Sequence, residues 1–358
     1  MIHYSFILVL LIPSIIYTFG INYKHNFFER LAFIVLFLIS SLQYNVGGDY
    51  SNYYIIFNQI AVGELFYQNE PLYYLLNKAV LFFDLPFNTI LILADLFFFT
   101  VLYKFFNKVD KQYRFMLFFI FMFSYDAYWS KLIYLRQEIA MAFLILAIQY
   151  IEKKSFSKYF TFILIGSLFH NTLVFFLPFY FLNKITTLRV YVVFCVIAMA
   201  IFFTNYIIDI LGFRQYVYYL EQEYEQGFSI GYAVKLFVFG WGIYFFRYNK
   251  SILFTLFLIG QYISIVKYFL PMLGIIELYF IIFHIYGLFL MIRYVNKSFG
   301  QYISFSLFVL ILIYNFISLN KTIVNKPDYY FWDRYKIILF ENNDLEGVTN
   351  KWIYRENK

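Results

Sequence analysis

Long apolar runs alternate with short polar or basic segments along nearly the whole chain. A membrane-spanning helix needs about 20 mostly apolar residues, and inside a bilayer its backbone polar groups are satisfied within the helix itself. The pattern therefore predicts an all-α, polytopic integral membrane bundle of about 11–12 transmembrane segments. The predicted spans cover residues 3–21, 29–45, 87–106, 114–130, 132–151, 159–183, 190–208, 231–247, 251–270, 274–293 and 301–319.

Composition supports the same class. Of the 358 residues, 63% are hydrophobic and 14% are charged, whereas a soluble globular protein has about 25% charged residues. The net charge of +7 comes from basic residues in short clusters between apolar runs. Such clusters are typical of loops that set membrane orientation, so we predict the lipid bilayer as a partner and exclude nucleic acid. The single cysteine, Cys195, cannot form an internal disulfide, and no Cys/His spacing suits a metal. We predict neither a metal nor a cofactor.

The basic clusters also predict which loops face the cytoplasm. Clusters at 104–114 and 153–158 fall in alternate loops, which places the N-terminus outside. The first apolar run lacks a basic start and a small-residue cleavage site, so we predict a retained span. The predicted parts are a membrane domain over 1–320, with outer loops at 46–86 and 209–230, and a polar C-terminal tail over 321–358.

The run 159–183 does not fit a single crossing. It lies between Lys158 and the basic residues Lys184 and Arg189, and one crossing would put that pair outside. Two full spans would need more than about 25 residues at about 1.5 Å per residue. We therefore predict a re-entrant or short helical hairpin with His170 near its tip, its backbone shielded by protein or by a wet cavity.

The outer segment 46–86 is predicted to contain two helices lying in the membrane interface. Gly47 and Gly48 permit a tight turn, and Asp49 can then cap a helix through its side-chain oxygen. Glu70-Pro71 marks a second helix start, because proline suits the first helical position. The apolar face of this second helix is predicted to consist of Leu72, Leu75, Leu76, Ala79, Val80 and Phe83.

Two polar islands inside apolar runs carry the strongest functional signal, and they contain Arg136 and His170. Ionisable residues within membrane segments are costly and by default indicate a functional site. A guanidinium can grip phosphate oxygens, and a histidine can accept a proton from a sugar hydroxyl. The structural alternatives are a snorkelling arginine or one paired with Glu138 or Asp126, and a buried histidine bonded to a neighbouring helix.

Other ionisable residues lie within or near predicted spans: Asp95, Lys235, Lys267, Glu277 and His284. Interhelical pairs would account for these groups, and so would a proton relay in a transporter. Walker and dinucleotide-binding glycine motifs are absent from the sequence. An enzyme of this kind would therefore take an activated substrate from the membrane itself.

Three polar motifs occur in a fixed order along the chain: VGGDYSNY at 46–53, LRQEIA at 135–140 and LFHNT at 168–172. In order and spacing they resemble the EpsG-like branch of the Wzy-type O-antigen and exopolysaccharide polymerases. The resemblance covers about residues 20–185, and the remainder is similar only in hydropathy. It departs from the expected Gly-Thr-Asp at Gly48, and it has Lys267 where an arginine is expected near a late outer helix end.

The resemblance implies a glycosyltransferase in the bacterial inner membrane with its active site facing the periplasm. It would join repeat units carried on undecaprenyl pyrophosphate, with donor and acceptor glycans as partners and a possible chain-length regulator protein. The implied catalytic residues are His170, Arg136 and Asp49, with His170 as first choice of base and Asp49 as second. The implied substrate-binding residues are Gly48, Tyr50, Tyr53, Gln137, Asn171 and Lys267.

Three alternatives remain open at the level of sequence. A lipid-linked oligosaccharide flippase also binds pyrophosphate, but it calls for cations along a central cavity rather than islands on one side. An O-antigen ligase would perform similar chemistry on a different acceptor. A membrane acyltransferase could use an Arg/His or His/Asn pair.

Overall fold

The computed structural model describes the chain from residue 27 to residue 337 with gaps. The described residues are 27–44, 49–64, 70–109, 114, 117–118, 120–122, 124, 128, 133–184, 230–248, 250–267, 273–325 and 336–337. The predicted spans 3–21 and 190–208, most of 114–130, the outer loop 209–229 and the glycines Gly47 and Gly48 lie outside these residues.

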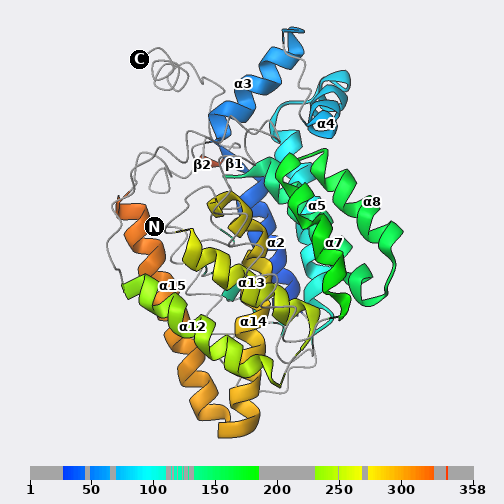
Figure 1. Cartoon of the computed structure of the whole chain (residues 1–358). Coiled ribbons are helices and arrows are strands. Elements are labelled where there is room, and N and C mark those ends of the chain that lie inside the picture. The colour runs from blue at the N-terminus through cyan, green and yellow to red at the C-terminus, as the bar shows by residue number, and fades with distance from the viewer. Residues whose placement is uncertain are drawn as a thin grey trace. The chain divides into compact units, whose positions relative to one another are not determined.

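Helices dominate the described residues, as predicted (Figure 1). The first half contains α2 (Phe27–Ser41), α3 (Tyr50–Ala61), α4 (Pro71–Phe82), α5 (Asn88–Phe106), α7 (Leu135–Glu152) and α8 (Phe156–Ser167). A 3-10 helix, η2 (Asn171–Lys184), is followed by α12 (Ile230–Phe246), α13 (Ile252–Val266), α14 (Leu273–Phe299) and α15 (Gln301–Asn325). Two short strands, β1 (Gln43–Tyr44) and β2 (Lys336–Ile337), pair antiparallel and join the predicted tail to the end of α2.

Two of the described helices, α5 and α14, are long and apolar enough to cross a membrane. Shorter apolar helices lie at Asn171–Leu182, Gly231–Phe246, Ile252–Val266 and Tyr302–Tyr314. The helical class of the prediction is therefore confirmed for the described residues, whereas the number of spans stays a prediction. The predicted span 29–45 is shorter than expected, because α2 ends at Ser41 and β1 follows.

The chain forms two compact units. Unit 1 comprises residues 1–146, 162–171 and 310–358, and unit 2 comprises residues 147–161 and 172–309. Within unit 1, α2 packs on α5 and α3 packs on α4. Ser40 of α2 donates a hydrogen bond to Asp95 of α5 (2.8 Å), so an interhelical contact accounts for this buried carboxyl group.

The packed face of α3 consists of aromatic and aliphatic residues at helical spacing. Tyr50, Tyr53 and Phe57 turn inward and join a core cluster with Tyr73 of α4. Phe87, which precedes α5, lies edge-on to Tyr50 with ring centroids 5.4 Å apart. This cluster packs α3 and α4 against α5 and so positions the first residues of α4.

The apolar face predicted for α4 is largely not buried in the protein, and Val80 is its one fully buried member among these described residues. The buried residues of this helix are Tyr73, Asn77 and Val80, and the predicted Leu75, Ala79 and Phe83 are exposed, as is Phe82 with 83% of its surface exposed. Residues 70, 73, 77 and 80 share one helical face, and polar groups on that face turn toward the protein. The outward apolar surface fits a helix in contact with lipid.

The predicted hairpin around His170 is present. The arms, α8 and η2, run against each other: the Tyr159 hydroxyl donates to the Phe176 carbonyl (2.5 Å), and the Phe156 and Tyr180 rings lie 5.0 Å apart. Pairing of early residues of α8 with late residues of η2 makes the arms antiparallel. His170 lies in the bend between the arms, and its depth in a bilayer stays a prediction.

Unit 2 contains a bundle in which α13 packs against both α12 and α14. Glycines allow the close approach. A Cβ at Gly287 of α14 would lie 2.1 Å from Cγ of Phe257 on α13, and a Cβ at Gly260 of α13 would lie 2.5 Å from Nε2 of His284. Small residues at helix contacts are how membrane helices gain van der Waals packing without a hydrophobic driving force.

Candidate functional site

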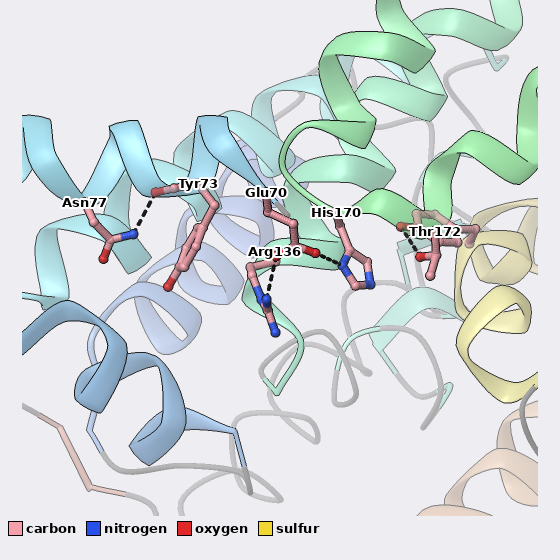
Figure 2. Close-up of polar contacts among 7 residues, drawn as sticks. Glu70, Tyr73, Asn77, Arg136, His170 and Thr172 are labelled. Atoms are coloured by element: carbon pink, nitrogen blue, oxygen red, sulfur yellow. Dashed lines mark hydrogen bonds and ion pairs between the residues drawn. The ribbon is translucent and has the colours of Figure 1, made fainter. Parts of the chain in front are cut away.

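Glu70 joins the two residues that the sequence singled out. Its Oε2 accepts from Nη1 of Arg136 at 2.5 Å, and its Oε1 lies 2.6 Å from Nδ1 of His170 (Figure 2). The Glu70 side chain is only 4% exposed, and those of Arg136 and His170 are 22% and 14% exposed. One buried carboxylate therefore holds an arginine and a histidine from sequence positions 66 and 100 residues away.

The local sequence explains how Glu70 is placed. Pro71 occupies the first turn of α4, where its missing N–H costs nothing, and Glu70 is the residue before the helix. The backbone N–H of Leu72 donates to the carbonyl of Leu168 (3.1 Å), which ties the first turn of α4 to the hairpin bend. Figure 2 shows Glu70, Tyr73 and Asn77 projecting from the same side of α4.

Arg136 enters the site from the first turn of α7 and is framed by aromatic rings. Its guanidinium carbon lies 5.4 Å from the ring centre of Tyr53 and 5.8 Å from that of Tyr73. Planar guanidinium groups favour such contacts with aromatic faces. The two rings restrict the guanidinium, and Tyr53, which was predicted to bind substrate, contacts the arginine directly.

Asp49 also belongs to this site, although its position before α3 suggested a helix-capping role. It occupies the residue before α3, yet its side chain makes no capping hydrogen bond, so the prediction of a side-chain cap is wrong. Its carboxyl group bonds the Asn52 side chain and interacts electrostatically with Arg136 and His170. Unit 1 thus brings together the three residues predicted to be catalytic.

The pKa values of the Glu70 and Asp49 carboxyl groups are shifted in opposite directions. Burial alone would raise the pKa of Glu70, but the hydrogen bond with His170 and the charge of Arg136 outweigh it, so the pKa is lowered. Burial raises the pKa of Asp49, and the charge of Arg136 and the bond with Asn52 offset this only in part. Burial also raises the pKa of the Tyr53 hydroxyl. Paired groups with separated pKa values are a recurring sign of acid and base roles.

The other residues that were predicted to bind substrate lie elsewhere in the core, at helix ends or in unit 2. Tyr50 is buried and its hydroxyl donates to Oδ1 of Asn88 (3.3 Å), which makes it part of the core beneath the site. Gln137 is buried beside Arg136 on α7, and Asn171 begins η2. Gly48 lies outside the described residues. Lys267 belongs to unit 2, where it pairs with Glu277.

Glu70 is the site residue that the sequence pattern did not reveal, because the adjacent proline accounts for it as a helix start. The available signal was indirect: a partly buried arginine in a membrane protein calls for a carboxylate partner, and Glu70 is one of four acidic residues in the segment 46–86. Among the described residues, no group of three His, Cys, Asp or Glu side chains could hold a metal ion.

Comparison with known proteins decides the family. The model of the EpsG family matches residues 26–336, which is most of the chain. The chain belongs to the EpsG family. No curated protein and no solved structure matches it. The resemblance predicted from the three motifs is therefore confirmed.

Membership of the EpsG family indicates a polymerase-like function in polysaccharide biosynthesis. Together with the long apolar helices α5 and α14, it identifies a membrane protein. The acidic and basic residues of the site, Asp49, Glu70, Arg136 and His170, all lie within the part of the chain that the family model covers.

Proposed function

We propose that this EpsG-family protein is a glycosyltransferase that polymerises oligosaccharide repeat units carried on undecaprenyl pyrophosphate. The reaction would take place on the periplasmic side of the inner membrane and build O-antigen or exopolysaccharide. The single observation that carries the proposal is the Glu70 carboxylate bonded to both Arg136 and His170. This arrangement supplies a cation for a leaving pyrophosphate and an oriented base for an acceptor hydroxyl.

His170 is the proposed general base. A carboxylate at Nδ1 favours the tautomer that carries its proton on Nδ1, which leaves Nε2 to accept a proton. The bond to Glu70 also fixes the orientation of the ring. The part of Glu70 is therefore to position and polarise the histidine rather than to touch substrate.

The proposed step forms one bond and breaks one. The acceptor hydroxyl oxygen bonds to the anomeric carbon of the donor glycan, and the bond from that carbon to the pyrophosphate oxygen breaks. The electron pair of the broken bond leaves with the lipid pyrophosphate, and the hydroxyl proton passes to Nε2 of His170. Developing charge on the leaving group needs a fixed cation.

Arg136 is the proposed cation for the leaving group. A guanidinium carries five N–H donors in a fixed fork, so an ion pair at Nη1 with Glu70 is compatible with contact to phosphate oxygens. The side chain is 22% exposed, which gives a lipid headgroup access. Tyr53 and Tyr73 keep the guanidinium plane in place.

Asp49 is the proposed second acid/base group. Its raised pKa increases the protonated fraction of a carboxyl group next to the cation of Arg136. In that form it can donate a hydrogen bond to a phosphate oxygen, and after losing the proton it can serve as an alternative base.

The deciding experiment uses a strain in which the gene is deleted and replaced by variants. We expect Arg136→Ala and His170→Ala to stay in the membrane and to leave single repeat units in place of long polymer. Removing a charge partner of the transition state typically costs about 10²–10³ in rate. Arg30→Ala is a matched control, because Arg30 is an exposed arginine of α2 away from the site.

The pattern on a polysaccharide gel separates the candidate functions. Loss of every band above one repeat unit supports polymerisation. Repeat units that stay on the cytoplasmic side would indicate a flippase instead, and long polymer that is not attached to its final acceptor would indicate a ligase. A normal length distribution from both site variants would refute the roles of Arg136 and His170.

A further inference from the structure

Unit 2 contains a second cluster in which one carboxylate is shared by two cations. Glu277 of α14 pairs with Nζ of Lys267 through Oε2, and its Oε1 lies 3.7 Å from Nζ of Lys235. Ser264 adds a hydrogen bond to the same carboxylate. The Glu277 side chain is buried, whereas the two lysine side chains are 23% and 28% exposed.

The three charged residues come together at one end of the α12–α13–α14 bundle. Lys235 lies near the start of α12, Lys267 follows the last residue of α13, and Glu277 lies in the second turn of α14. The buried Glu277 carboxylate thus pairs with both ammonium groups, and both lysine side chains remain partly exposed. The three groups carry two positive charges and one negative charge.

Such a cluster is built like an anion site. An ammonium group is a compact donor with three N–H bonds, and two of them held side by side can share the oxygens of one phosphate.

We propose that Lys235 and Lys267 form a second phosphate-binding site, with Glu277 as the positioning residue that holds them together. The ligand class is a phosphate or pyrophosphate group, either on a lipid or free in solution. The second site rests on the proposed function in one respect. A polymerase handles a donor and an acceptor that each carry a lipid pyrophosphate, so it has use for two phosphate-binding sites. The binding itself is independent of catalysis.

The test is done in the Arg136→Ala background, which removes the arginine of unit 1 from any phosphate contact. The purified protein is titrated with inorganic pyrophosphate in detergent while its melting temperature is followed. A second arm uses nanodiscs of phosphatidylcholine with and without a polyisoprenyl phosphate. A melting shift in the first arm alone points to a free anion, and a larger shift in the second arm points to a lipid phosphate.

Adding Lys235→Ala or Lys267→Ala is expected to weaken the affinity for the effective probe about tenfold each, as for loss of a hydrogen bond to a charged group. Lys235→Arg keeps the charge and is expected to keep binding, so it separates loss of the site from loss of folding. Lys250→Ala is the matched control, because Lys250 is an exposed lysine just before α13.

Equal affinity in the lysine variants and in the Lys250→Ala control would overturn the second site, and so would the absence of any melting shift with both probes. These outcomes are distinct from failure of the proposed function. If the wild-type protein makes no polymer but binds phosphate through the two lysines, the polymerase proposal fails and the binding site stands.

Discussion

The two units each place one buried carboxylate between two basic side chains, but they do so with different chemistry. Glu70 in unit 1 holds Arg136 and His170, whereas Glu277 in unit 2 holds Lys235 and Lys267. Only the first cluster contains an imidazole, the side chain that serves most often as a general base. The second cluster can hold an anion but offers no such base among these three residues.

The supporting structure of the two clusters differs as well. Glu70 and His170 lie at a helix start and in a hairpin bend, where the backbone departs from regular helix. Lys235 and Glu277 lie within helices of a bundle packed through glycine. Irregular backbone at a polar site is a common feature of membrane enzymes and transporters where it is shielded by protein. The comparison is therefore our basis for proposing chemistry at the first cluster and binding at the second.

The largest expected effect comes from neutralising the two carboxylates in turn. Glu70→Gln is expected to lower the rate of polymerisation about 10²–10⁴-fold, the range for general acid–base catalysis, because it removes the charge that orients His170 and holds Arg136. Glu277→Gln is expected to act mainly on substrate affinity. The measurement is kcat and KM with lipid-linked repeat units in purified protein.

Glu152→Gln is the matched control for both variants, because Glu152 is an exposed glutamate at the end of α7. Glu70→Asp keeps the charge and should recover part of the rate. If Glu70→Gln and Glu277→Gln changed kcat by the same factor, the division into a chemical cluster and a binding cluster would be wrong.

A second, smaller effect comes from exchanging the two kinds of cation. Arg136→Lys keeps a positive charge but loses the planar fork and its contacts with Tyr53 and Tyr73. We expect about a tenfold loss of kcat, equivalent to about 1.4 kcal/mol of transition-state stabilisation. Lys267→Arg should leave kcat unchanged, because either cation can hold a phosphate. A greater loss of kcat from Lys267→Arg would contradict this assignment.

The sequence alone revealed the class of fold and three of the four acidic and basic residues of the candidate site. Arg136 and His170 stand out because they interrupt apolar runs, and Asp49 because it follows two glycines. The hairpin around His170 follows from the balance of basic loops and the length of the run 159–183. These features are local, so a linear pattern can carry them.

What the pattern did not reveal depends on contacts between distant segments. Glu70 lies 100 residues before His170 and is explained locally by Pro71. The inward face of α4 could not be predicted from hydrophobicity, because in a membrane protein an apolar helical face can point to lipid as well as to the core. Asp49 follows the sequence rule for a helix cap, but the charges of the site engage its carboxyl group instead.

A third, smaller effect concerns the packing of α13 against α14 and its contribution to the stability of unit 2. Gly287→Ala would place a methyl group 2.1 Å from Cγ of Phe257 and force α13 and α14 apart. Overpacking of this kind costs about 1–3 kcal/mol. We expect a lower melting temperature together with weaker phosphate binding at Lys235 and Lys267. Gly240→Ala is the control, since nothing lies within 4 Å of a Cβ at Gly240. An equal loss of stability in both variants would argue against the tight α13–α14 contact.

The smallest expected effect separates the two carboxyl groups of unit 1 by pH. The pKa of Asp49 is raised in the folded protein, so its ionised form destabilises the fold as pH rises from the unfolded value of 3.8 through the folded pKa. Asp49→Asn should therefore raise the melting temperature at neutral pH, with the gain vanishing toward pH 4.

The pKa of Glu70 is lowered in the folded protein, so its ionised form stabilises the fold. This stabilisation is present above the unfolded value of 4.5 and is lost as pH falls through the folded pKa. Glu70→Gln should thus lower the melting temperature at neutral pH and approach the wild type in acid. If Asp49→Asn lowered the melting temperature at neutral pH, Asp49 would be a stabilising residue after all, and its proposed place as a second acid/base group would lose its physical basis.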